Sequence, residues 1–375
     1  MRFIKIKSIS IFNNHLIDYP TPIVGYLSSF GSLSGLCLVI QIMTGILLTA
    51  HYTPHVTLAF VSLEHIIRDV NDGWLFRYYH INGASIFFIC IYLHIYINFS
   101  SEGDDLLWLS GILLYLLLII TAFIGYILPW GQISFWGATV ITNLFAAIPY
   151  IGTDIAQWLW GGFSVDNPTL NRFFSFHYIL PFLIFAGIIL HLSLLHLDES
   201  SSEDDEYIEF YYYYFIKDLF AFFFLIIFFS IIVFFNPDHL SHPDNYIIAS
   251  ISVTPGHLVP EWYFLPFYAV LRSTPDKFGG LILIFFILFD IFLIDIIIDS
   301  TINLFKLNDT TSFLHNNFII IDTDLEEDDD AGFLIILLFL GGRDIDEPYT
   351  DISIILSFLQ FLDYFDLELE ENINE

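Results

Sequence analysis

Long apolar segments recur along this chain and are separated by shorter polar stretches. Six of them are long enough to cross a bilayer as helices, because about 17–25 residues rising about 1.5 Å each match a hydrocarbon core of about 30 Å. They are residues 27–50, 78–99, 106–128, 173–197, 219–235 and 281–298. Two shorter apolar runs, 333–340 and 352–365, are candidates for two further spans. The pattern predicts an all-α, polytopic transmembrane helical bundle of about eight spans.

The composition agrees with a membrane protein. Hydrophobic residues make up 56% of the chain and charged residues only 14%, about half the share in an average soluble domain. The two cysteines, Cys37 and Cys90, both lie inside predicted spans, so neither a disulfide framework nor a zinc site is indicated. The net charge of −31 owes much to acidic runs at 198–209 and 322–330. Such runs are typical of solvated loops and argue against nucleic acid as a partner.

Two of the predicted spans each carry two histidines at the same interval. His80 and His94 are fourteen residues apart, and so are His177 and His191. Fourteen residues make nearly four helical turns, so the two rings of one helix share a face about 21 Å apart. One span separates these two helices, so they cross the membrane in the same direction. Either span alone could carry two satisfied interfacial histidines, but the matched pairs favour two stacked bis-histidine sites.

Haem fits such sites. Iron with two axial imidazoles is an electron carrier, and the flat macrocycle fills the space between two helices. The sequence has no C-x-x-C-H motif, so the haems would be non-covalent and of the b type. Gly31 and Gly45 in the first span, and Gly111 and Gly125 in the third, repeat the fourteen-residue interval. Glycine would let the edge of a macrocycle approach the backbone, although small residues at this spacing also serve helix packing.

The chain between about residues 26 and 275 carries further specific motifs. They include "FGSLSGLCLVIQIMTGILLTAHYT", "GYILPWGQISFWGATVITNL", "HPDNY" and "TPGHLVPEWYFLPFYAVLRSTPDK". In these motifs the chain resembles the cytochrome b family, in the mitochondrial form that serves the quinol–cytochrome c reductase complex (respiratory complex III). The resemblance implies that residues 1–210 form a four-helix bundle holding two haems. It implies that residues 211–375 form a second transmembrane part with a quinol-oxidation loop.

The resemblance also assigns the haem ligands. His80 and His177 would be the metal ligands of a low-potential haem on the intermembrane-space side. His94 and His191 would ligate a high-potential haem toward the matrix. Arg77, one turn before His80, is placed to pair with a haem propionate, and read alone it is equally typical of a membrane interface.

Two quinone sites are implied as well. In the "PEWY" motif, Glu261 and Tyr263 would be catalytic in quinol oxidation, which releases two protons and suits a carboxylate beside an apolar slot. The residues implied to line that slot are Phe123, Tyr126, Gly137, Val140, Pro260 and Phe264. On the other side, His196 and Asp218 would serve quinone reduction, with Ser32 and Lys217 also binding the quinone. Without the resemblance, "PEWY" is typical of an interfacial aromatic belt and the other residues of helix ends.

The chain departs from the family pattern in three places. After His94 the family continues with a small residue and an arginine near the haem propionates, but here the chain reads Ile95-Tyr96-Ile97-Asn98. Tyr96 or Asn98 would supply the hydrogen bonds there instead. The loop after His196 is short and acidic, and the last third of the chain matches only at "LGGRDIDEPY" and in general hydropathy.

The resemblance implies an enzyme, a ubiquinol–cytochrome c oxidoreductase that couples electron transfer through two b haems to proton translocation across the mitochondrial inner membrane. The implied partners are a Rieske-type iron–sulfur subunit, a c-type cytochrome subunit, other complex III subunits, membrane lipid and a second copy of the chain. Two alternatives stay open from the residues. A di-haem b membrane anchor of another respiratory dehydrogenase would not need the 260–263 motif. A transporter with a histidine proton relay would not need haem.

Overall fold

The structure, a computed structural model, is helical and forms two compact units. It describes residues 20–22, 26–98, 105–196, 207–256, 258–274, 276–285, 336–337, 339–343 and 352–353. The first unit contains residues 1–134 and 170–249, and the second contains residues 135–169 and 250–375. Within the described residues the only strand pairing is short and antiparallel, between β1 (Pro20–Pro22) and β2 (Tyr207–Glu209). The predicted all-α class is confirmed.

Five long helices of the first unit correspond to the first five predicted spans. They are α2 (Phe30–Thr49), α4 (Gly73–Asn98), α5 (Asp105–Ile127), α8 (Asn167–Leu195) and α9 (Phe210–Phe235); the first three residues of α8 belong to the second unit. Each is long and apolar enough to cross a membrane. The helices α4, α8 and α9 begin before the apolar runs do, because a helix continues into the polar interface. The sixth predicted span and the two short candidates lie largely outside the described residues.

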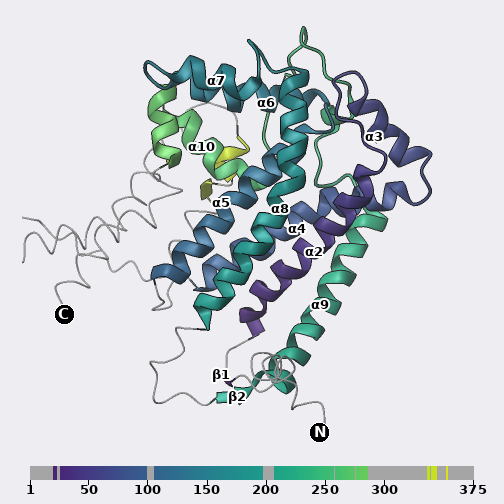
Figure 1. Ribbon diagram of the computed structural model, residues 1–375, viewed down its shortest axis with the longest axis vertical. Helices are drawn as coiled ribbons and strands as arrows, with labels where there is room; N and C mark the ends of the chain where they lie inside the picture. The colour runs from purple at the N-terminus through teal and green to yellow at the C-terminus, as the bar shows by residue number, and fades with distance from the viewer. Residues whose placement is uncertain are drawn as a thin grey trace, which may run out of the picture. The chain divides into compact units, whose positions relative to one another are not determined.

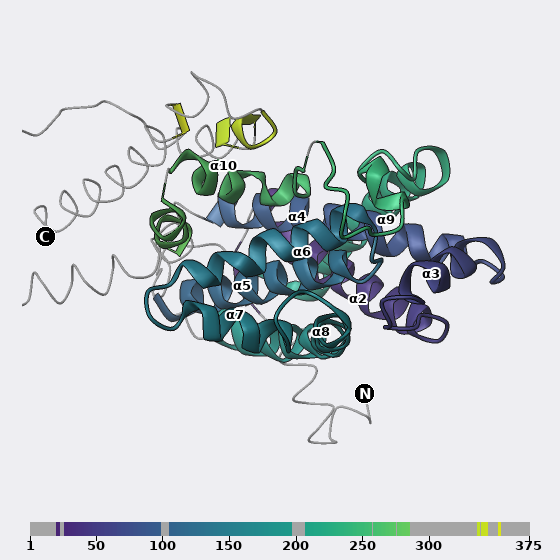
Figure 2. The ribbon, with the colours of Figure 1, turned by 90° about the horizontal axis from the view of Figure 1, so that it is seen from above.

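The helices of the first unit alternate in direction along the chain. Figure 1 shows α2, α5 and α9 running one way and α4 and α8 the other, as the sequence predicts for the two histidine-bearing spans. Seen from above, α4 and α8 lie on opposite sides of the bundle, with α2 and α5 flanking them (Figure 2). The backbones of α2 and α4 approach closely along their length.

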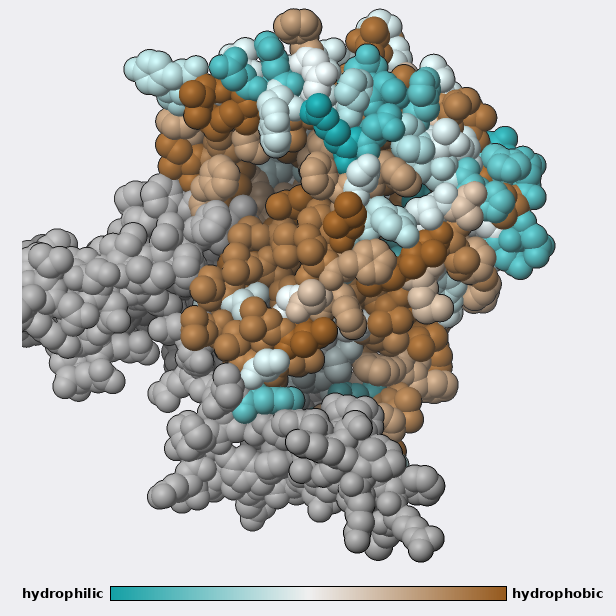
Figure 3. Space-filling view, in the orientation of Figure 1, coloured by the Kyte–Doolittle hydropathy of each residue, from teal (hydrophilic) through white to brown (hydrophobic). Residues whose placement is uncertain are grey.

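The outer surface of this bundle is apolar. Large side chains on α8 and α9 face outward; Leu190, for example, is 58% exposed and Phe223 is 60% exposed. Figure 3 shows the corresponding apolar belt over the long helices. Exposure of such a surface to water would be unfavourable in free energy. The hydrocarbon of a bilayer or a neighbouring subunit can cover it.

A short amphipathic helix and a loop junction complete the first unit. Helix α3 (Ala59–Arg68), which the apolar pattern did not predict, buries Ile66 and carries an ion pair of 2.5 Å between Glu64 and Arg68. The junction joins the "PWG" and "HPDNY" motifs, and the 3-10 helix η4 (Pro243–Tyr246) lies within it. Asn245 Oδ1 accepts hydrogen bonds from the backbone N (3.0 Å) and Oγ (2.9 Å) of Ser134. A Cβ on Gly131 would overlap the Asn245 backbone, so only glycine fits there.

The second unit holds the remaining described elements. They are most of α6 (Gln132–Leu144), η3 (Phe145–Ala147), α7 (Gly152–Trp160), η5 (Trp262–Phe264) and α10 (Leu265–Ser273). Helix α6 begins at Gln132, directly after Gly131 of the "PWG" motif. Trp160 Nε1 donates to Thr142 Oγ1 at 2.6 Å and so ties α7 to α6. The predicted functional division at residue 210 stays a prediction.

Candidate functional site

The structure brings the four histidines of α4 and α8 together in two pairs. The ring centroids of His80 and His177 are 6.0 Å apart at an interplanar angle of 87°. Those of His94 and His191 are 6.5 Å apart at 78°. The residues therefore pair at two levels of the bundle, His80 with His177 and His94 with His191, which is the pairing that their spacing predicts.

Each of the four rings faces one of the four glycines. A Cβ on Gly31 would lie 3.1 Å from Cε1 of His94, and one on Gly45 would lie 3.1 Å from Cε1 of His80. The corresponding distance from Gly111 to Cε1 of His191 is 3.3 Å, and a Cβ on Gly125 would overlap the His177 ring. The glycines of α2 thus face the histidines of α4, and those of α5 face the histidines of α8. Any larger residue would press on an imidazole.

Three of the imidazoles have their tautomer fixed by an oxygen at Nδ1. His177 Nδ1 donates to the carbonyl oxygen of Thr121 at 2.8 Å, because a carbonyl can only accept. Thr44 Oγ1 lies 3.0 Å from His80 Nδ1, and the Thr44 hydroxyl donates its hydrogen bond to the Ile40 carbonyl at 2.7 Å. Its oxygen therefore accepts from His80, and Nε2 of both histidines keeps a lone pair that can bind a metal.

In the other pair, only His191 is held in this way. Ser110 Oγ lies 2.7 Å from His191 Nδ1 and donates its proton to the Leu107 carbonyl at 2.7 Å, so it too accepts from the ring. His94 Nδ1 instead lies 3.2 Å from the amide nitrogen of Asn98. Thr44 and Ser110 are not among the site residues predicted from the sequence. A signal was present, because each is a hydroxyl residue directly before one of the four glycines.

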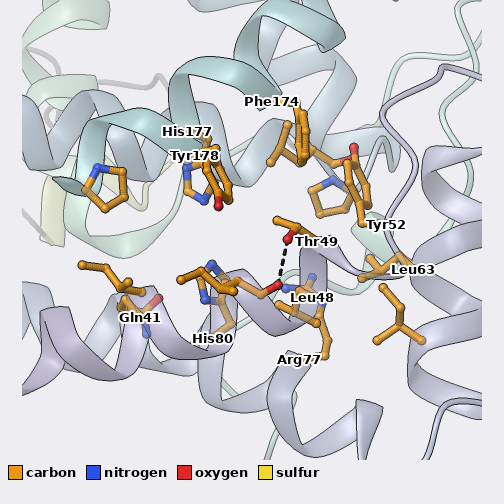
Figure 4. Close-up of a pocket in the computed structure, with 18 of the residues that line it drawn as sticks. Gln41, Leu48, Thr49, Tyr52, Leu63, Arg77, His80, Phe174, His177 and Tyr178 are labelled. Atoms are coloured by element: carbon orange, nitrogen blue, oxygen red, sulfur yellow. Dashed lines mark hydrogen bonds between the residues drawn. The ribbon is translucent and has the colours of Figure 1, made fainter. Parts of the chain in front are cut away.

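A pocket opens beside the His80–His177 pair (Figure 4). Arg77, Tyr52 and Phe174 contribute to its lining together with the two imidazoles. Tyr52 donates its hydroxyl to the Leu128 carbonyl at 2.7 Å, and its ring lies 5.5 Å from that of Phe174. Burial raises the pKa of Tyr52 well above the usual value, so its hydroxyl stays protonated. The pocket is mostly apolar with one cationic side chain, Arg77, which suits a flat apolar group that carries an acidic substituent.

An iron held by two imidazoles fixes the distance between their rings. Two metal–nitrogen bonds of about 2.0 Å and two imidazole radii of about 1.1 Å place ring centroids about 6.2 Å apart across one metal. The observed 6.0 and 6.5 Å bracket this value. Within the described part of the chain, no group of three or more His, Cys, Asp or Glu side chains could hold a metal ion. Two ligands per level fit a metal whose other positions are filled by its own macrocycle, so the residues fit haem.

The residues predicted for quinol oxidation belong to both units. Phe123 and Tyr126 lie in α5 of the first unit, where the Phe123 ring is 6.4 Å from that of Phe173. In the second unit, Gly137 and Val140 lie in α6, and Pro260 and Glu261 directly precede η5. Tyr263 is only 4% exposed, and its ring lies 4.6 Å from that of Phe264. The assembly of these residues into one site stays a prediction.

The residues predicted for quinone reduction lie near one end of the first unit. Ser32 is at the start of α2, His196 follows α8, and Lys217 and Asp218 are near the start of α9; these three helix ends lie at the same end of the bundle (Figure 1). Ser32 Oγ donates to the Ser29 carbonyl at 2.8 Å. Lys217 Nζ lies 5.3 Å from the Tyr214 ring centroid. Their joint action on a quinone stays a prediction.

Comparisons with known proteins cover both units. Residues 16–199 match the family described as "Cytochrome b/b6/petB", and residues 248–361 match "Cytochrome b(C-terminal)/b6/petD". The chain is 48% identical to cytochrome b of Cyanidium caldarium over 372 residues, which is 96% of this chain and 94% of the relative. It is 56% identical to cytochrome b of Chondrus crispus over 290 residues, 75% of this chain and 76% of that one.

The chain belongs to the cytochrome b family.

A solved structure described as a hyperthermophilic respiratory complex III has the same fold. It matches with a TM-score of 0.81 at 26% identity, over 98% of this chain and 97% of that one. Membership of the cytochrome b family makes the chain a membrane-spanning electron-transport protein that binds haem b.

Proposed function

We propose that this chain is the haem-carrying core of a quinol–cytochrome c reductase, which oxidises quinol at one membrane surface and reduces quinone at the other. The observation that carries the proposal is the arrangement of two level histidine pairs, each ring faced by a glycine, in a member of the cytochrome b family. A di-haem chain whose two sites are separated along the membrane normal is suited to moving electrons across the bilayer.

The four histidines are the proposed ligands of two haem b groups, His80 with His177 and His94 with His191. When bound, these groups accept and pass on single electrons. The chain holds the imidazoles in place through Thr44, Thr121 and Ser110, and the glycines leave room for the macrocycles. Arg77, which lines the pocket beside His80, is the proposed partner of a propionate.

Quinol oxidation is assigned to the loop around η5. Glu261 is the proposed acceptor of a quinol proton, since a carboxylate within reach of the reacting hydroxyl can serve as a general base. Tyr263 is the proposed hydrogen-bonding residue beside it. The apolar wall is assigned to Phe123, Tyr126, Gly137, Val140, Pro260 and Phe264.

Quinone reduction is assigned to the end of the first unit where α2 and α9 begin and α8 ends. A quinone that gains two electrons also takes up two protons, which His196 and Asp218 can deliver from solvent. Ser32 and Lys217 are the proposed hydrogen-bonding groups for the quinone carbonyls. Proton release at one surface and uptake at the other would make the electron transfer translocate charge across the membrane.

The proposed setting is the mitochondrial inner membrane. The proposed partners are a Rieske-type iron–sulfur subunit, a c-type cytochrome subunit, further complex III subunits and a second copy of the chain. The wide apolar surface of α8 and α9 is available for lipid and for neighbouring transmembrane helices.

The test is an absorption spectrum of the purified complex, followed by an assay of quinol-dependent reduction of soluble cytochrome c. Two b-type haem signals are expected, with cytochrome c reduction that stops when quinol is omitted. Absence of haem would favour the histidine proton relay of a transporter. Two haems without any quinol-dependent reduction of cytochrome c would favour a membrane anchor of another dehydrogenase.

A further inference from the structure

Two buried hydroxyl groups contact histidine rings that belong to neighbouring helices. Thr44 Oγ1 on α2 lies 3.0 Å from His80 Nδ1, and Ser110 Oγ on α5 lies 2.7 Å from His191 Nδ1. Both hydroxyl residues are only 8% exposed. Each stands directly before the glycine that faces the same ring. The same short stretch of helix therefore leaves space beside an imidazole and supplies its hydrogen-bond partner.

The direction of these two hydrogen bonds follows from the backbone around each hydroxyl. Thr44 Oγ1 donates to the carbonyl of Ile40 at 2.7 Å, and the carbonyl of Gln41 at 3.3 Å is a second acceptor. Ser110 Oγ donates to the carbonyl of Leu107 at 2.7 Å. A hydroxyl has a single proton, so each oxygen meets the imidazole with a lone pair and accepts from Nδ1. The lone pair of Nε2 is then left for iron.

The two histidine pairs differ in how many of their rings have such an acceptor. In the His80–His177 pair both rings do. In the other pair His191 does, whereas Nδ1 of His94 lies 3.2 Å from the amide nitrogen of Asn98. That nitrogen donates to the backbone carbonyl of His94 at 2.6 Å, so Asn98 offers this ring no acceptor. The count of acceptors is therefore two in the first pair and one in the second.

We infer that Thr44 and Ser110 are positioning residues that each lower the reduction potential of one haem. Thr44 acts on the haem held by His80, and Ser110 acts on the haem held by His191. The inference rests on the proposed function. An acceptor at Nδ1 makes the imidazole more basic. A more basic ligand stabilises ferric iron, which carries one more positive charge, over ferrous iron.

The unequal number of acceptors has a consequence for electron transfer. Two acceptors lower the potential of the His80/His177 haem more than one acceptor lowers that of the other haem. Hydrogen bonds of this kind are stronger in the apolar interior of the bundle than in water. The difference favours passage of an electron from the first haem to the second, which is the direction that the proposed quinone sites require.

The experiment measures both haem potentials in the intact membrane complex by redox titration of the visible absorbance. Thr44→Val keeps the shape of the side chain but removes the acceptor, so the potential of the His80/His177 haem should rise and the gap between the haems should narrow. Ser110→Ala should raise only the potential of the other haem and widen the gap. We expect a change of about tenfold in the relative affinity for ferric and ferrous iron. For one electron this corresponds to about 59 mV.

Thr44→Ser is the matched control, because it keeps the hydroxyl and should keep the parental potential. Electron paramagnetic resonance of the ferric haems should show low-spin iron with two imidazole ligands in every variant. The inference is overturned if Thr44→Val or Ser110→Ala leaves the potential of its own haem at or below the parental value. It is overturned too if Thr44→Ser shifts the potential as much as Thr44→Val does, or if either haem is lost. Absence of two b haems in the parent complex would instead refute the proposed function.

Discussion

Replacement of Gly125 by alanine is the most direct test of the glycine–imidazole arrangement. A Cβ at this position would overlap the His177 ring and would lie 2.8 Å from its Nδ1 atom. The ring cannot withdraw freely, since Nδ1 is bonded to the Thr121 carbonyl at 2.8 Å. Either that hydrogen bond breaks or α5 moves away from α8. Both changes disturb the His80–His177 pair, so the variant should bind the haem of that pair weakly.

The size of the effect follows from the cost of overpacking. An extra methyl group in a well-packed site costs about 1–3 kcal/mol. At about 1.4 kcal/mol per tenfold, haem retention at this site should fall by about 5-fold to 150-fold. Alanine itself favours a helix interior over glycine by about 1 kcal/mol, so a weakened helix cannot explain the loss. Gly111→Ala is the matched control, because there the nearest ring atom would be 3.3 Å away.

The assay is haem stoichiometry per complex, measured by pyridine haemochrome, together with redox titration of the two b signals during detergent washing. In Gly125→Ala the signal of the His80/His177 haem should disappear first while the other stays. Gly111→Ala should weaken its own haem less than Gly125→Ala weakens the His80/His177 haem, because its Cβ would lie 3.3 Å from the His191 ring and would not overlap it. Equal retention of the His80/His177 haem in Gly125→Ala and in the parent would refute the reasoning, and so would equal loss of both haems.

Three further predictions concern other parts of the chain. His94→Leu should abolish the haem of the His94/His191 pair and keep the other, as measured by redox-resolved spectra; two complete bis-histidine signals would contradict the ligand assignment. Glu261→Gln should slow quinol oxidation by about 10²-fold or less, because general-base effects of about 10²–10⁴ can be partly replaced by water; parental rates at every pH would limit Glu261 to a structural role. Asn245→Ala removes the acceptor of Ser134, which is 0% exposed. The loss of this acceptor should lower the free energy of unfolding by about 1–3 kcal/mol and reduce the thermal unfolding midpoint. Asn71 is exposed, so Asn71→Ala should leave the midpoint unchanged. Equal midpoints for the two variants would contradict this role of Asn245.

The spans and the histidine pairing could be predicted from the sequence because both follow local rules. Apolar length against bilayer thickness located α2, α4, α5, α8 and α9, and helical periodicity placed His80 level with His177. The helix ends were less accurate. Helix α4 begins at Gly73 rather than at residue 78, because its first turn extends into the interface, where polar residues cost little.

Other features depend on tertiary contacts that no local pattern contains. Helix α3 is short and amphipathic, so it contains no long apolar run that would predict it from the sequence. The bond between Asn245 and Ser134 joins residues 111 positions apart, and only the folded chain brings them together. The contact of Asn98 with His94 is local, at one helical turn, but the sequence alone left open whether its amide would bond an imidazole or a propionate.

The repeated interval of fourteen residues has a physical reason in the packing of the bundle. Fourteen residues are two heptads, and an ideal straight helix drifts about 20° per heptad, hence about 40° over this distance. When helices coil around each other with a left-handed twist, the coiling compensates for this rotation. Residues two heptads apart then stay on the face toward the bundle axis. His80 and His94 obey this rule on α4, and Gly111 and Gly125 obey it on α5. If haem binds as proposed, the ligands and the glycines repeat at the same interval because each macrocycle would need two imidazoles and two glycines at one level.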